Sequence, residues 1–107
     1  MFKINVSRIE DHTFILYLKG ELTAATSLVF HQALIPIMKK RPKAISINLS
    51  NVDTIDEAGI SLLMNGFMGT TQQGTYFYLI GLPNKVKEYY RSRSAEMGHS
   101  YFSMNTH

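Results

Sequence analysis

Three carboxylates lie close together near the middle of the chain, at Asp53, Asp56 and Glu57. Neighbouring carboxylates can act as general acid and base, so this cluster is the first candidate for catalysis. No other catalytic side chain accompanies them at a matching spacing. Asp56 also stands where a helix would begin, and an aspartate there accepts hydrogen bonds from free backbone N–H groups. We therefore predict a helix cap and two solvated acids, and no catalytic residue.

The other reactive side chains do not form the pattern of a metal or cofactor site. The sequence has no cysteine, and its histidines at positions 12, 31, 99 and 107 show no i, i+4 pair and no metal-ligand spacing. The segment 69–74 lacks the lysine of a phosphate-binding loop, and termination of a helix at Gly74 explains it. We predict neither a metal nor a cofactor.

One tight basic run occurs in this chain of formal net charge +3, formed by Lys39, Lys40, Arg41 and Lys43. Cations at a helix C-terminus complement the helix dipole. Runs of like charge usually face water, so we expect a solvated turn here. A contact with a phosphate or a lipid headgroup is the alternative.

Aromatic residues are concentrated at Tyr76, Phe77 and Tyr78. Rings of this kind can stack on nucleic-acid bases. Because no lysine or arginine is interleaved with them, we expect them to be core residues of a strand, and we expect no nucleic-acid partner.

The composition is that of a single globular domain covering residues 1–107. Hydrophobic residues make up 45% and charged residues 18%, which excludes a disordered or collagen-like chain. No apolar run approaches the roughly 18 residues that a membrane span needs. The N-terminal segment alternates and carries charge, unlike a signal peptide. We expect a cytoplasmic protein with no direct membrane insertion.

Alternating strands and helices are predicted to position these side chains. Strands are expected at 2–8, 13–18, 44–49, 75–80 and 101–104, with helices opening at Thr23, Asp56 and Pro83. Pro36 predicts a kink or an early end in the first helix, and Gly74 and Gly98 end the other two. This order predicts an α/β fold with a mostly parallel central sheet of about five strands, an N-terminal hairpin and three helices.

The most informative segment covers residues 45–67. A buried strand, suited to a parallel sheet covered by helices, is expected to end at Ser50, and a loop at 51–54 leads into the second helix. Gly59 permits close packing or an unusual backbone angle. Because this helix is apolar nearly all round, we expect a partner to cover its outer side, including Met64.

Three motifs in this order resemble the STAS domain family, which includes the bacterial anti-sigma factor antagonists. They are Gly20-Glu21-Leu22, Asn48-Leu49-Ser50-Asn51-Val52-Asp53-Thr54-Ile55-Asp56-Glu57-Ala58-Gly59-Ile60, and the segment from Gly74 to Leu82. The resemblance extends from Phe14 to about Phe102. It implies a (β/α) superhelix that works by binding other proteins, with no catalysis of its own.

In antagonists of this family, a partner kinase that is also the anti-sigma factor phosphorylates a serine or threonine after the motif aspartate. That position is Glu57 here, which has no hydroxyl group, so phospho-switching at this position is not expected. Thr23 stands where antagonists commonly carry a partner-contacting aspartate. Glu57 is either a phosphoserine mimic at a helix N-terminus or simply a favourable first-turn residue, and we favour the second interpretation.

The resemblance therefore implies a regulator similar to an anti-sigma factor antagonist, acting in transcription regulation through a kinase-like anti-sigma factor or an equivalent switch protein. The expected partner-binding residues are Thr23, Asp53, Thr54, Asp56, Glu57, Ala58, Gly59, Ile60 and Met64. The alternative is a cytoplasmic STAS accessory subunit of a phospholipid-transport ABC system. Many family members continue into a last helix, whereas three residues follow Met104, so we also expect a homodimer through residues 99–107.

Overall fold

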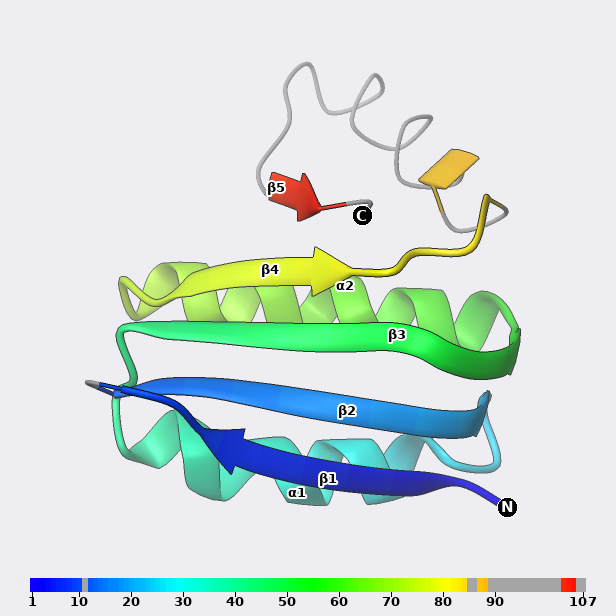
Figure 1. Ribbon diagram of the computed structural model, residues 1–107, viewed down its shortest axis with the longest axis horizontal. Helices are drawn as coiled ribbons and strands as arrows, with labels where there is room; N and C mark the ends of the chain where they lie inside the picture. Colours follow the sequence, from blue (N-terminus) through cyan, green and yellow to red (C-terminus); the bar gives the residue numbers. More distant parts are fainter. Residues whose placement is uncertain (11, 85–86, 89–102, 106–107) are drawn as a thin grey trace.

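Five strands form one sheet whose spatial order is the order of the chain (Figure 1). The structure is a computed structural model, and it describes residues 1–10, 12–84, 87–88 and 103–105. The strands are β1 (Lys3–Arg8), β2 (Thr13–Leu22), β3 (Ala44–Ile55), β4 (Tyr76–Ile80) and β5 (Ser103–Asn105), and the helices are α1 (Ser27–Lys39) and α2 (Glu57–Gln72). The α/β class predicted from the sequence is confirmed.

The first two strands form the predicted hairpin, and the remaining pairs are parallel. β1 runs antiparallel to β2, with Lys3 opposite Lys19 and Arg8 opposite Phe14. His12 takes a positive φ of 58° in the connecting turn, which lets the chain reverse. β2, β3, β4 and β5 then pair in parallel. The carboxyl ends of β2 and β3 therefore lie at the same edge of the sheet.

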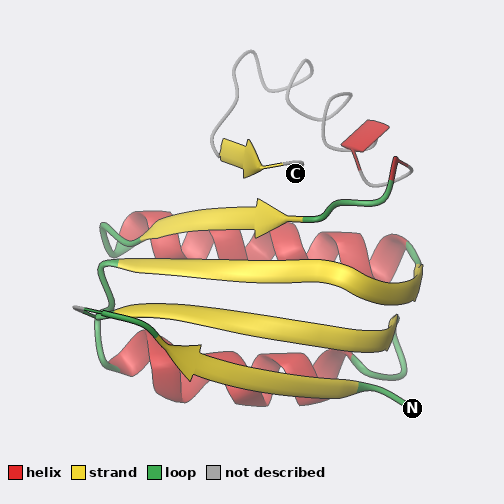
Figure 2. Ribbon diagram, in the orientation of Figure 1, coloured by secondary structure: helices red, strands yellow, loops and turns green. Residues whose placement is uncertain are grey.

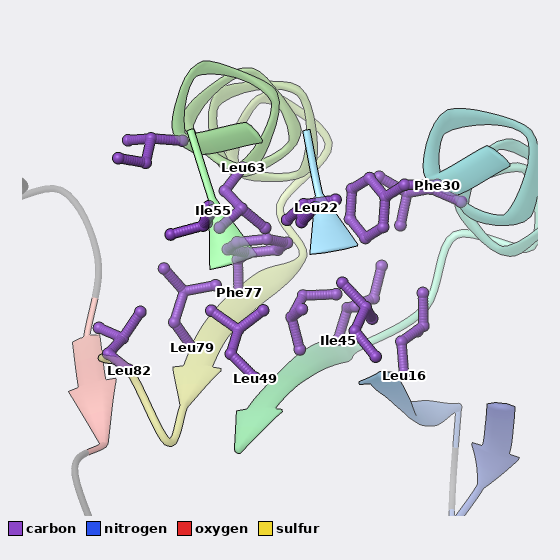
Figure 3. Close-up of a cluster of buried hydrophobic side chains, with 14 of the residues drawn as sticks. Leu16, Leu22, Phe30, Ile45, Leu49, Ile55, Leu63, Phe77, Leu79 and Leu82 are labelled. Atoms are coloured by element: carbon purple, nitrogen blue, oxygen red, sulfur yellow. The ribbon is translucent and has the colours of Figure 1, made fainter. Parts of the chain in front are cut away.

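Both helices pack on one face of the sheet, behind the strands in Figure 2. The buried side chains of the strands alternate and point toward these helices, as in Figure 3. The most deeply buried are Leu16, Leu18, Leu22, Phe30, Ile45, Ile47, Leu49, Ile60, Leu63 and Leu79. Burying one such side chain contributes about 1.5–3 kcal/mol, so this single layer of contacts holds the helices to the sheet.

The opposite face of β2, β3 and β4 is more open than the sequence predicts. Phe77 is core as expected, but Tyr76 is 64% exposed and stacks on Tyr78 with ring centroids 6.4 Å apart. Tyr17 of β2 is also exposed on this side. The prediction of core tyrosines is therefore wrong for Tyr76, because alternate residues of a strand face opposite sides and α1 and α2 cover one side only.

The first helix begins later than predicted and does not end at Pro36. Thr26, not Thr23, is the residue before its first turn, and α1 runs through Pro36 to Lys39. Proline removes the N–H that would bond to the carbonyl of Gln32. Both Gln32 and Pro36 are exposed, so water can reach that carbonyl and the helix continues. Of the two outcomes predicted at Pro36, the early end is wrong and the kink remains a prediction.

The third strand extends through the segment that we predicted as a loop. β3 continues to Ile55 because β2 also continues, to Leu22, and supplies partners for it. The pairing is irregular: β3 advances from Asn48 to Asn51 while β2 advances only from Tyr17 to Lys19. A further shift follows Gly20. Because these bulges adjust the register, the polar residues of 51–54 belong to a strand, and the predicted loop is wrong.

The second helix ends as predicted, and the chain beyond β4 is described only in part. Gly74 has a φ of 83°, the left-handed conformation of a helix stop. The Lys87 N–H donates to the Pro83 carbonyl oxygen at 3.1 Å, as in the first turn of the predicted third helix. The rest of that helix, the predicted strand residues 101 and 102, and most of the dimer segment 99–107 lie outside the described residues.

Candidate functional site at the N-terminus of α2

Asp56 caps α2, as the sequence predicts. The Gly59 N–H donates to Asp56 Oδ1 at 2.8 Å, and the Ile60 N–H donates to the backbone oxygen of Asp56 at 3.0 Å. The bond from Gly59 lowers the pKa of the Asp56 carboxyl below its ordinary value of 3.8; desolvation opposes this shift, and the Ala24 N–H reinforces it. The carboxylate is therefore held ionised against the positive end of the helix dipole.

The same carboxylate joins α2 to the loop that precedes α1. The Ala24 N–H donates to Asp56 Oδ2 at 3.3 Å, and the Asp56 N–H donates to the Leu22 carbonyl oxygen at 3.4 Å. These bonds tie the ends of β2 and β3 together at the carboxyl edge of the sheet. The loop 23–26 and the first turn of α2 therefore form one continuous surface.

Thr26 fixes the shape of that loop. Its hydroxyl donates to the Glu21 carbonyl oxygen at 2.6 Å and accepts the Thr23 N–H at 3.0 Å. The Ser27 hydroxyl donates to the Ala24 carbonyl oxygen at 3.0 Å. We did not predict these positioning roles. The signal in the sequence was the hydroxyl cluster at 23, 26 and 27, because threonine and serine bond readily to neighbouring backbone in turns.

Gly59 allows α2 to approach β2 closely. A Cβ built at Gly59 would overlap the carbonyl oxygen of Leu22. Gly59 has no positive φ, so of the two roles allowed by the sequence the structure supports close packing. Any larger residue would push the start of α2 away from the loop that Asp56 binds.

The predicted partner-binding residues separate into a surface and its support. Asp53, Thr54, Glu57 and Ala58 are exposed, and Thr23 and Asp56 are half-buried. We call these six residues the α2 N-terminal surface. Gly59 and Ile60 are buried, the latter only 2% exposed, so they support this surface and are not available for contact.

The outer side of α2 is less apolar than the sequence suggests. Met64 is partly buried and packs against the core, because it lies one turn beyond Ile60 on the inner side. Ser61 and Asn65 are exposed and provide a polar outer side over this part of the helix. The prediction of a helix that is apolar nearly all round is wrong for residues 57–65.

The three carboxylates of this region differ in their exposure and hydrogen bonding. Asp53 and Glu57 are exposed, and the Asp56 carboxylate accepts backbone hydrogen bonds from Ala24 and Gly59. Within the described ranges, no three acidic or histidine side chains are grouped to hold a metal ion. No described helix is long and apolar enough to cross a membrane.

The chain belongs to the STAS domain family, whose sequence pattern it matches over residues 3–96. A comparison with the sequences of curated proteins finds no match. The fold recurs in solved structures, and the surface described above lies within the matched region.

Three similar structures illustrate the range of this fold. An anti-sigma factor antagonist from Mycobacterium paratuberculosis has a TM-score of 0.80 at 15% identity, over 98% of this chain and 86% of that one. The Bacillus cell fate determinant SpoIIAA in its phosphorylated form has a TM-score of 0.78 at 11% identity, over 98% and 91%. A sulfate transporter family protein from Wolinella succinogenes has a TM-score of 0.71 at 13% identity, over 92% and 80%. At these identities the likeness shows the fold alone.

Proposed function

We propose that the protein is a non-catalytic regulator that binds another protein through the α2 N-terminal surface, in the manner of an anti-sigma factor antagonist. The observation that carries the proposal is the double role of Asp56, which caps α2 and holds the Ala24 loop beside it. Two segments are thereby fixed as one rigid, acidic surface before any partner arrives. Such preorganisation lowers the entropic cost of association.

The proposed partner is a kinase-like anti-sigma factor or an equivalent switch protein. Asp53, Asp56 and Glu57 give the surface several negative charges, which suits a partner site that carries positive charge. Glu57 is exposed in the first turn of α2. The resemblance of the sequence motif supports its equivalence to the phosphorylated residue of antagonists. The Glu57 carboxylate supplies a constant single negative charge there, so the affinity for the partner does not depend on phosphorylation of residue 57.

The decisive experiment combines capture of the partner from the native cell with a charge-reversal pair. Glu57→Lys reverses the charge at the centre of the surface. Glu10→Lys makes the same change in the exposed β1–β2 turn, at the other end of the sheet. Calorimetric titration with the captured partner should show roughly tenfold or greater weakening for Glu57→Lys and none for Glu10→Lys. Equal affinities of the two variants would refute the assignment of the surface.

A second candidate function is that of an accessory subunit of a membrane transporter, for which we suggested a phospholipid-transport ABC system. The likeness to the sulfate transporter family protein is the observation that favours it. The identity of the captured partner separates the two functions. A soluble ATP-binding protein supports the first, and a membrane ATPase supports the second.

A further inference from the structure

An apolar groove lies between α1 and α2, and none of the six residues of the α2 N-terminal surface lines it. Its volume is about 300 Å³. Phe30, Leu34 and Met38 line it at successive turns of α1, and Leu62 lines it from α2. The Gln73 side-chain amide donates to the Met38 carbonyl oxygen at 3.3 Å and holds the C-terminal ends of the helices together. The proposed regulatory function makes no use of this groove.

Apolar surface continues from the groove onto the outside of α1. Ile35 lines the groove and is 38% exposed, and Leu28, two turns earlier, is 62% exposed. Their spacing of two turns places Leu28 and Ile35 on the same face of α1. Single exposed apolar residues are ordinary, but a row of them continuous with an apolar groove is typical of a binding site.

Charge is distributed unevenly along the groove. Lys39 lines its end at the C-terminus of α1, and His31 lines it two turns earlier. Four cations occur between positions 39 and 43, whereas α1 contains no acidic residue from Ser27 to Lys39. The helix dipole places only about half a negative charge at this terminus, so the end of the groove remains positive.

We propose that this groove binds a single-chain amphiphile with an anionic headgroup, of which a fatty acid is the simplest example. The acyl chain lies on Phe30, Leu34 and Leu62, and the headgroup lies beside Lys39. The volume is at the lower limit of small-molecule sites and suits one chain rather than two. Met38, at the cationic end, has the flexible side chain that adapts to a mobile acyl chain. Lys39, the first residue of the basic run, would thereby make the headgroup contact that we gave as the alternative to a solvated turn.

The test is a titration of the isotope-labelled protein with decanoate, kept below its critical micelle concentration and followed by amide chemical shifts. We expect saturable shifts at residues 30–39 and 62–65. Octanoate should bind more weakly, by up to about fourfold for each methylene removed, because each methylene contributes through its burial. Decyltrimethylammonium, with the same chain and the opposite charge, should bind more weakly than decanoate.

A matched pair of variants assigns the headgroup site. Lys39→Glu should weaken decanoate binding roughly tenfold, because it replaces an attraction by a repulsion. Lys19→Glu makes the same charge change on the open face of the sheet and should leave binding unchanged. Circular dichroism and the Tm of both variants establish that they are folded.

Three results would overturn the proposal. The first is equal binding of decanoate and decyltrimethylammonium. The second is equal decanoate binding by Lys39→Glu and Lys19→Glu. The third is the absence of saturable decanoate binding, whether the protein instead binds vesicles of phosphatidylglycerol, an acidic helical peptide or neither.

Discussion

The Asp56 carboxylate accepts the backbone N–H of Ala24 at 3.3 Å, although 32 positions separate the two residues in the chain. One side chain thus connects the loop before α1 with the first turn of α2. Each of the two carboxylate oxygens has its own partner, Ala24 for one and Gly59 for the other. Local helix capping and long-range assembly of the candidate surface therefore depend on the same residue.

Removing the Asp56 side chain should destabilise the protein. Asp56→Ala loses the helix cap and the link to Ala24, and we expect the Tm to fall by about 5 °C. Asp56→Asn keeps one acceptor oxygen, enough for the cap to Gly59, and should lose less. Differential scanning calorimetry checks both. An unchanged Tm in Asp56→Ala would contradict the role of these hydrogen bonds.

The contribution of Asp56 to stability should depend on pH in a defined direction. Its pKa is lowered in the folded protein, so the unfolded chain takes up a proton first as the pH falls. The stabilisation is fully present above the ordinary value of 3.8 and is lost as the pH falls through the lower folded value. Urea unfolding should show the advantage of the wild type over Asp56→Asn to be constant from about pH 7 to 5 and reduced below about pH 4. A difference that does not change with pH would show that the carboxylate charge is not involved.

Gly59→Ala should destabilise the protein, although alanine favours helix formation more than glycine does. Glycine costs a helix about 0.5–1 kcal/mol relative to alanine, so Gly59→Ala would stabilise α2 in isolation. In the protein the new Cβ overlaps the Leu22 carbonyl oxygen, and we expect a net loss of about 1–3 kcal/mol in the free energy of unfolding. Ser61→Ala, on the exposed side of the same helix, is the control and should change it by less than about 0.5 kcal/mol.

Neighbouring residues of β4 should respond very differently to truncation. Phe77→Ala removes a core side chain and should cost about 3–5 kcal/mol in unfolding free energy. Tyr76→Ser changes a side chain that is 64% exposed and should cost less than about 1 kcal/mol. Urea denaturation measures both. Similar costs would mean that the open face of the sheet is covered in solution.

Incubation with the partner kinase and ATP should leave residue 57 unmodified in the wild type, because Glu57 has no hydroxyl group for a kinase that phosphorylates serine or threonine. Glu57→Ser restores a hydroxyl at the start of α2, and intact-mass spectrometry should then detect one added phosphate. A stoichiometric phosphate on Thr54 or Ser61 of the wild type would show that the modification site lies at a neighbouring residue. Binding of unmodified Glu57→Ser, compared with the wild type, separates the two interpretations of Glu57: tighter binding supports a phosphoserine mimic.

Much of the site could be predicted because its signals are local. Asp56 and Gly59 lie three positions apart, and the capping pattern needs no knowledge of the rest of the fold. The link from Asp56 to Ala24 could not be predicted in this way, because it depends on where β2 and β3 end in space. Thr26 was missed although the hydroxyl cluster at 23, 26 and 27 is a local signal, because its acceptor, Glu21, lies beyond the predicted end of the second strand.

The errors in the fold have equally specific causes. Asn51 and Asp53 are polar and favour a loop, but the extended β2 beside them offers backbone partners, and bulges adjust the register. In β4 every residue is apolar or aromatic, so alternation does not identify the buried side. The structure places Phe77 and Leu79 inside because these positions face α1 and α2, which cover a single face.

The order of the strands has a consequence for how the chain acquires its structure. Each described strand pairs with the described strand that precedes it in the sequence, so each pair can form as soon as its second strand has been synthesised. Thr13 nevertheless pairs with Ala44, and Ala44 with Tyr76, and parallel pairing over such separations in the sequence makes folding slow compared with that of helical proteins. On the ribosome, the β1–β2 hairpin can form first, and each later strand and helix can add to an existing edge as it emerges. The Asp56–Ala24 link would close only when α2 begins, and so would mark the step at which the first half of the domain becomes fixed.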